Sequence, residues 1–166
     1  MLFSLIKLLI VLVLLVTLLC IFRTWQMEHS ANQEAFLKGT VPNPAPDGLY
    51  HGSVGRNVSW LGKKFSAEGG SASGGDAFIG TGINVFDDGD GVRSERYQFV
   101  TSIGKGVRDT EKDVLKIDYN ITANPWWVRF IFDEIVQTAP NEYLGKLHAR
   151  FISGYPFTLG YFTLKK

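Results

Sequence analysis

Residues 113–119 read Asp113-Val114-Leu115-Lys116-Ile117-Asp118-Tyr119. Leu115, Ile117 and Tyr119 alternate with Lys116 and Asp118 along this stretch. Because successive side chains of a β-strand point to opposite faces, the alternation predicts a strand with an apolar face and a polar face. An antiparallel sheet that covers one core is typically built from such strands.

Similar runs recur along the chain from residue 48 onward, separated by turn residues such as Asp87-Asp88-Gly89-Asp90-Gly91 and Ala139-Pro140-Asn141. The eight predicted strands are residues 48–54, 58–65, 78–86, 96–104, 113–121, 132–138, 142–151 and 157–164. Short strands with turn residues between them predict a sandwich or a barrel. The Gly/Ser-rich residues 66–75 are predicted to form a mobile loop.

The same alternation assigns faces on two further strands. Tyr97, Phe99, Thr101 and Ile103 share one face of their strand. On the strand over residues 142–151, the set Tyr143, Leu147, Ala149 and Phe151 opposes the set Leu144, Lys146, His148 and Arg150. We expect the apolar sets to define the interior and the other sets to face solvent.

The N-terminal segment, residues 2–22, is an apolar run with Lys7 as its single charge. A helix of this length spans about 30 Å, which matches the bilayer core. Trp25 follows the run, where an indole favours the headgroup region. The segment therefore predicts an uncleaved, single-pass signal-anchor helix.

Three alternatives to this anchor are open. A cleaved signal peptide needs small residues before its cleavage site, and none is convincing near residues 18–24. Lipidation of Cys20 is disfavoured because Leu19 precedes it, and a buried core helix is disfavoured because the run is uniformly apolar. No larger basic cluster follows the run, so we expect the N-terminus in the cytoplasm and the β domain on the periplasmic or lumenal side.

These features divide the chain into three parts. Residues 1–23 are the predicted transmembrane anchor, residues 24–47 a polar stalk and Pro-rich linker, and residues 48–166 the β domain.

One short helix is predicted over residues 126–132, because Asn124 can cap it and Pro125 suits its first position. A β-hairpin arm is the competing interpretation. The cluster of Trp126, Trp127 and Phe130 could serve as a ligand lid, a membrane wedge or a partner surface, or simply close one barrel end.

Composition and spacing argue against several function classes. The formal net charge of +1 offers no electrostatic case for nucleic acid. The acidic run at residues 87–91 lacks EF-hand spacing, and no Cys/His cluster has zinc spacing, so we expect no metal and no cofactor. His148 could be a haem ligand, but an exposed strand histidine is the favoured interpretation.

No catalytic set is evident, and we expect no enzymatic activity. Asp133 and Glu134 could perform acid/base chemistry, but cross-strand charge pairs on a solvent face have the same pattern and are favoured. An enzyme would need Asp118, Asp133, Glu134 or His148 to converge in a cleft.

Two short motifs carry a family resemblance. Gly48-Leu49-Tyr50-His51-Gly52 resembles the G-x-W-x-G element that opens calycin-like barrels, with Tyr50 in place of Trp. Trp60-Leu61-Gly62-Lys63-Lys64-Phe65 resembles the W-x-G-K-x-F segment of GXWXG/DUF4334-type domains. The resemblance implies a mainly β fold, a lipocalin-like antiparallel barrel of about eight strands, and it transfers no catalytic residue.

Two functions compete on these grounds. The first is a membrane-anchored barrel that binds a lipid or another apolar ligand. Its predicted ligand-binding residues are Tyr50, Trp60, Phe99, Tyr119, Trp126, Trp127, Phe130 and Tyr143. The alternative is a non-catalytic accessory subunit that docks on a larger membrane protein complex.

Overall fold

The computed structural model describes residues 2–55, 58–67, 77–152 and 154–166. Two helices precede the strands, and a 3₁₀ turn interrupts them. The elements are α1 Leu2–Glu28, α2 Ala31–Lys38, β1 Gly48–Ser53, β2 Trp60–Ser66, β3 Ala77–Asp87, β4 Arg93–Lys105, β5 Asp113–Asp118, η1 Val128–Phe130, β6 Ile131–Ala139, β7 Glu142–Ile152 and β8 Tyr155–Lys165. Most of the predicted loop at residues 66–75 lies outside the described residues.

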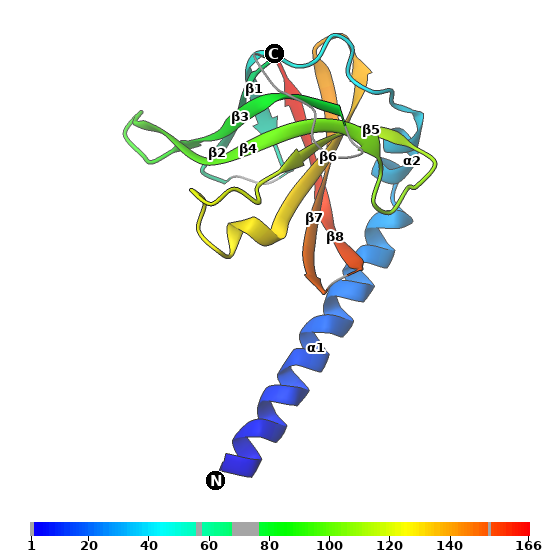
Figure 1. Cartoon of the computed structure of the whole chain (residues 1–166), viewed down its shortest axis with the longest axis vertical. Helices are drawn as coiled ribbons and strands as arrows, with labels where there is room; N and C mark the ends of the chain where they lie inside the picture. The colour runs from blue at the N-terminus through cyan, green and yellow to red at the C-terminus, as the bar shows by residue number, and fades with distance from the viewer. Residues whose placement is uncertain (1, 56–57, 68–76, 153) are drawn as a thin grey trace.

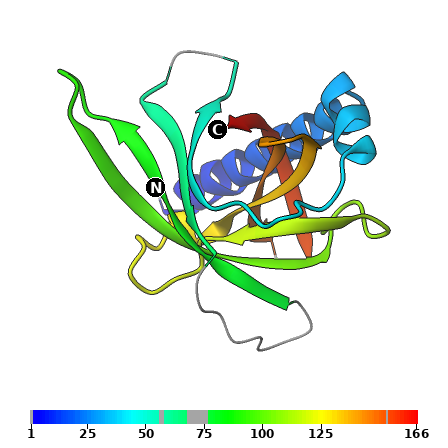
Figure 2. The same cartoon turned by 90° about the horizontal axis from the view of Figure 1, so that it is seen from above.

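The eight strands form a closed antiparallel barrel in which each strand pairs with the next and β8 returns to β1 (Figures 1 and 2). The closing pair sets Gly52 opposite Leu164. Antiparallel neighbours need only short connections, which is why turn residues recur at each predicted strand end. The predicted fold class, a mainly β antiparallel barrel of about eight strands, is confirmed.

Alternation correctly identified most of the barrel interior. Phe151, predicted to point inward, is instead 55% exposed, because the β7–β8 register shifts between Ala149 and Ile152 and breaks the alternation there. Phe99, Leu115, Ile117 and Tyr143 belong to one buried cluster, and Tyr119 completes the apolar set of its segment. The aromatic rings fit because glycine lies opposite them. A Cβ at Gly82 would come within 2.3 Å of the Phe99 ring, and one at Gly145 within 2.1 Å of the Phe162 ring.

The helices lie outside the barrel, on the side of β7 and β8 (Figure 2). Ser30 caps α2 by accepting a hydrogen bond from the Gln33 N–H, and Phe36 of α2 is buried against Val114, Val136 and Leu144. The expected stalk and linker segment thus includes the end of α1 and all of α2, and α2 packs on the barrel.

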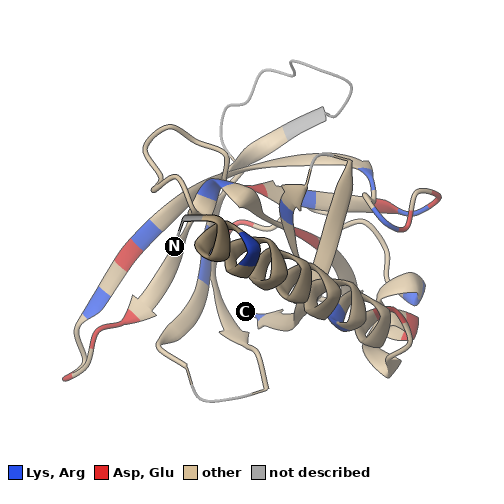
Figure 3. Ribbon diagram, turned by 90° about the horizontal axis from the view of Figure 1, so that it is seen from below, with Lys and Arg blue, Asp and Glu red and all other residues tan. Residues whose placement is uncertain are grey.

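The apolar part of α1 extends away from the barrel (Figure 1). By length and composition, Phe3–Glu28 is long and apolar enough to cross a membrane, and none of its most apolar window is buried. Figure 3 shows α1 from below as an almost uncharged rod, with a basic residue near its N-terminal end.

The predicted helix over residues 126–132 is shorter than expected. Only Val128–Phe130 forms a 3₁₀ turn, and β6 already begins at Ile131. Strand β6 pairs with both β5 and β7, and one helical turn carries too few hydrogen bonds to compete with two ladders.

Candidate ligand site inside the barrel

A polar cluster lies inside the barrel, centred on Lys63 of β2. Lys63 points inward because it shares the strand face of Phe65, and its side chain is only 3% exposed. Its Nζ lies 2.9 Å from Asp133 Oδ2 on β6 and 2.9 Å from Asn84 Oδ1 on β3. It also donates to the phenol oxygen of Tyr119, which follows β5. Four segments of the barrel therefore meet at one ammonium group.

Aromatic rings surround the same ammonium. Lys63 Nζ lies 5.1 to 5.4 Å from four ring centroids. The rings are those of Trp60, Phe99, Tyr119 and Phe162. A cation within about 6 Å of a ring face is attracted by the ring quadrupole, which offsets part of the loss of hydration.

Burial changes the pKa of both cluster donors. Desolvation lowers the pKa of Lys63, and the Asp133 carboxylate opposes that change. Burial raises the pKa of Tyr119 well above its usual range, and the charge of Asp133 raises it further. The phenol therefore keeps its proton and donates it to Asp133 Oδ2 at 2.9 Å.

An apolar cavity of about 210 Å³ lies next to this cluster. Lys63, Asn84, Tyr119 and Asp133 form its polar part. The apolar wall is formed by Val54, Phe86, Tyr97, Val128, Ile131 and Leu147. Trp127, half exposed, completes the lining near solvent. Such a cavity, with a few polar groups converging at one place, is the usual form of a small-molecule site.

The structure separates the eight predicted ligand-binding residues into three groups. Trp60, Tyr119 and Trp127 line the cavity. Tyr50, Phe99 and Tyr143 are buried in the adjoining core, where the ring centroids of Tyr50 and Tyr143 lie 5.2 Å apart. Trp126 and Phe130 lie on the outer surface, so they do not form a lid over the cavity.

Sequence reasoning did not identify Lys63 and Asn84 as site residues. Strand parity offered a signal, because Lys63 shares the inward face of Phe65, and Asp133 shares the inward face of Ile131 and Ile135. A buried lysine and a buried aspartate on inward positions of two strands are rare unless they pair.

A second feature is an open groove on the outer surface, which extends from the β4–β5 loop to the β7–β8 turn. Exposed apolar side chains line part of it, with Trp126 72% exposed and Phe151 55% exposed. Phe130, Ile152 and Tyr155 also belong to this rim. Four basic residues line the groove: Lys105, Lys116, Arg129 and Arg150. One carboxylate, that of Asp118, faces them and pairs with Arg150.

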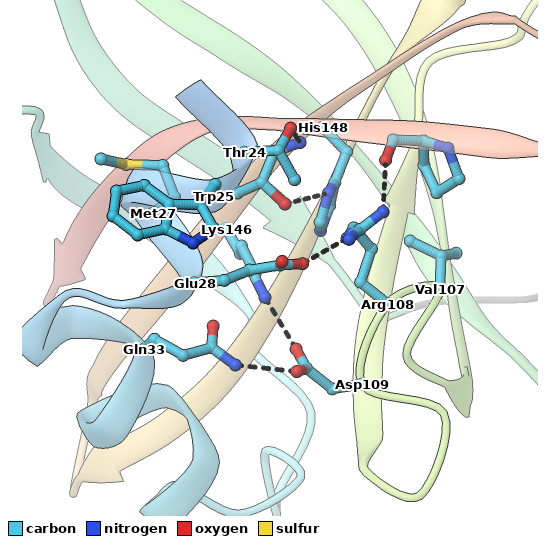
Figure 4. Close-up of polar contacts among 12 residues, drawn as sticks. Thr24, Trp25, Met27, Glu28, Gln33, Val107, Arg108, Asp109, Lys146 and His148 are labelled. Carbon is cyan, nitrogen blue, oxygen red and sulfur yellow. Dashed lines mark hydrogen bonds and ion pairs between the residues drawn. The ribbon is translucent and has the colours of Figure 1, made fainter. Parts of the chain in front are cut away.

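A third feature is a buried polar junction beneath the two helices (Figure 4). His148 was expected to be exposed, but it is fully buried, with Nε2 3.2 Å from Glu134 Oε2 and Nδ1 3.3 Å from Thr158 Oγ1. Glu134 also accepts from the Val107 N–H at 2.7 Å. The prediction that this face of β7 meets solvent is therefore wrong at His148, because the helices cover the face. The alternation of residues along a strand cannot reveal such a covering.

The structure also corrects the interpretation of Asp133 and Glu134. Both are buried rather than on a solvent face. Because they are consecutive on β6, Asp133 points into the barrel and Glu134 points outward beneath the β4–β5 loop, where it accepts from the Val107 N–H. Asp118, Asp133 and the His148–Glu134 pair therefore do not share one cleft. Among the described residues, no group of three or more His, Cys, Asp or Glu could hold a metal ion.

Comparisons with known proteins do not assign the chain to a family. No family model, no curated protein and no solved structure gives a significant match to the chain.

Proposed function

We propose that this protein is a membrane-tethered, lipocalin-like container that binds a lipid or another apolar molecule and performs no chemistry on it. In this proposal α1 anchors the chain, the barrel lies on the non-cytoplasmic side, and the ligand enters from the bilayer. The observation that carries the proposal is the 210 Å³ apolar cavity beside a buried polar cluster.

The direction of α1 supports entry from the membrane. Thr24 accepts a hydrogen bond from Thr158 and Met27 accepts one from Tyr161, so α1 and β8 run in the same direction. The N-terminal part of α1 therefore projects beyond the β7–β8 turn (Figure 1). In an up-and-down barrel, the β1–β2 and β5–β6 connections lie at that same end. Val54 and Trp127 of these connections line the cavity, so its mouth faces the proposed bilayer.

The rim residues support the same placement. Trp126, Phe151 and Tyr155 are exposed aromatic side chains at this end, and such side chains favour the membrane interface. Arg129 and Arg150, the basic residues of the groove at this end of the barrel, would then lie at the depth of the lipid phosphates.

The size of the cavity limits the ligand. An engineered cavity of roughly 150 Å³ holds benzene. A cavity of about 210 Å³ therefore suits a small apolar molecule or one end of a longer chain. The rest of a longer chain would leave past Trp127 toward the lipid.

The test is to extract the full chain from its membrane in polymer nanodiscs and to identify bound small molecules by organic extraction and mass spectrometry. A variant, Leu147→Trp, fills the cavity from its wall, and Val92→Trp is the matched control because Val92 is exposed and does not line the cavity. We expect a stoichiometric apolar species with the wild type and with Val92→Trp, and its loss with Leu147→Trp.

Equal lipid content in all three proteins would contradict the proposal. Recovery of a stoichiometric protein partner without a small molecule would instead favour an accessory subunit of a membrane complex.

A further inference from the structure

The hydrogen-bond inventory of the interior cluster indicates what the ligand must offer. The argument rests on the proposed function, since it concerns the molecule that occupies the same cavity. Each donor and acceptor of Lys63, Asn84, Tyr119 and Asp133 can be assigned a partner or shown to lack one.

The donors are all used. The three protons of the Lys63 ammonium face three acceptors, namely Asn84 Oδ1, Tyr119 Oη and Asp133 Oδ2. The Asn84 amide donates to the Tyr97 carbonyl at 3.1 Å and to Tyr119 Oη at 3.2 Å. Tyr119 gives its one proton to Asp133 Oδ2, and the Trp60 indole gives its proton to Asn84 Oδ1 at 3.0 Å.

One acceptor remains. Asp133 Oδ1 is buried and has no hydrogen-bond partner among the described residues, and Asp133 lines the cavity. Both contacts to this carboxylate fall on Oδ2. A buried acceptor without a partner carries a desolvation penalty that a ligand donor would remove.

We propose that the cavity selects an apolar molecule with a hydroxyl group, which donates its proton to Asp133 Oδ1. A carboxylate ligand is disfavoured, because the Lys63 protons are already used and its charge would face that of Asp133. An ether or a ketone is disfavoured because it has no proton to donate. A plain hydrocarbon would contact the apolar wall of the cavity but would leave Asp133 Oδ1 without a hydrogen-bond partner.

Four probes of matched chain length test this inference: 1-octanol, methyl octyl ether, octanoate and octane. Each is titrated into the full chain in phosphatidylcholine nanodiscs at equal mole fraction in the lipid. Binding is followed by the ¹³C-methyl resonances of Ile131 and Leu147, which line the cavity. We expect 1-octanol to bind at least about fivefold more tightly than each of the others, as the cost of an unpaired buried acceptor implies.

Asp133→Asn is the diagnostic variant. Its amide oxygen can retain the contacts with Lys63 and Tyr119, which places its NH₂ where Oδ1 was. That NH₂ donates to an ether oxygen as readily as to an alcohol oxygen, so the preference for 1-octanol over the ether should disappear. Val92→Asn, an exposed substitution elsewhere, should retain the preference.

The outcomes separate the two proposals. Equal affinity for 1-octanol and octane, tighter binding of octanoate, or a preference that survives Asp133→Asn would overturn the hydroxyl assignment and leave the container proposal standing. If no probe shifts the cavity methyl resonances, the container proposal itself fails.

Discussion

Lys146 Nζ lies 2.7 Å from Asp109 Oδ2, and this ion pair connects the outer face of β7 to the β4–β5 loop (Figure 4). The Lys146 side chain has no exposed surface. Gln33 of α2 donates to the other carboxylate oxygen at 2.8 Å, so one aspartate links the loop, the strand and the helix. The helices and the barrel are thus joined by buried charge as well as by apolar packing.

Replacing Asp109 with alanine should destabilise the chain strongly. It leaves Lys146 buried without a counter-charge, which typically costs about 3–5 kcal/mol. Asp113→Ala is the matched control, since it breaks the Lys105–Asp113 pair, in which both side chains are more than half exposed. The control should cost less than about 1 kcal/mol. Denaturant unfolding of the full chain in nanodiscs measures the unfolding free energy of both variants. Equal decreases for Asp109→Ala and Asp113→Ala would refute the structural role of Asp109.

Inside the barrel, removing one charge of the Lys63–Asp133 pair should lower the unfolding free energy more than removing both charges. Lys63→Met leaves the Asp133 carboxylate buried and uncompensated, and we expect a loss of about 3–5 kcal/mol. The double variant Lys63→Met/Asp133→Leu removes both charges and should be more stable than Lys63→Met alone. A double-mutant cycle on unfolding free energies measures the coupling. Losses that simply add would show that the two residues do not stabilise each other.

The rim should enter the bilayer interface. In a Cys20→Ser background, a polarity-sensitive dye attached at Ile152→Cys should show a blue-shifted emission in vesicles, because Ile152 belongs to the rim beside α1. Thr138 is exposed near the opposite end of the barrel, so the same dye at Thr138→Cys should show the unshifted emission of a dye in water. Identical emission at the two positions would contradict the proposed orientation of the barrel.

Stability should fall with increasing pH above about pH 10.5. Burial, together with the nearby Asp109 and Glu28 carboxylates, raises the pKa of Tyr161, whereas an unfolded tyrosine loses its proton near pH 10. In that range the unfolded state binds fewer protons than the folded state, so the unfolding free energy decreases as pH rises. Lys63 acts in the opposite sense, because its lowered pKa makes stability rise with pH until the unfolded lysine is also neutral near pH 10.5.

Tyr161→Phe should therefore make the fall in stability above pH 10.5 shallower. Gln33→Leu is the control, because it retains the phenol while it removes the 2.6 Å hydrogen bond from the Tyr161 hydroxyl, together with the hydrogen bond from Gln33 to Asp109. Thermal unfolding measured across this pH range gives the pH dependence of stability for Tyr161→Phe and Gln33→Leu and so distinguishes the two variants. A slope in Tyr161→Phe as steep as in the wild type would show that Tyr161 does not contribute to the alkaline loss.

The amino-acid sequence by itself determined where the strands lie along the chain and most of the apolar interior, because a period of two is a local property of the chain and Leu115, Ile117 and Phe99 display it plainly. It also determined α1, since a long apolar run needs no tertiary partner to be recognised.

Only the tertiary structure decided which charged and polar residues are buried and which partners they have. Parity places Lys63 and Asp133 on inward faces, but their pairing at 2.9 Å depends on the closure of the barrel, which brings β2 and β6 together across the interior. His148 and Lys146 follow an outward pattern, yet they are buried because α1 and α2 cover β7. A strand pattern states which side of a sheet a residue faces, and only the folded chain decides whether that side meets solvent, a helix or a cavity.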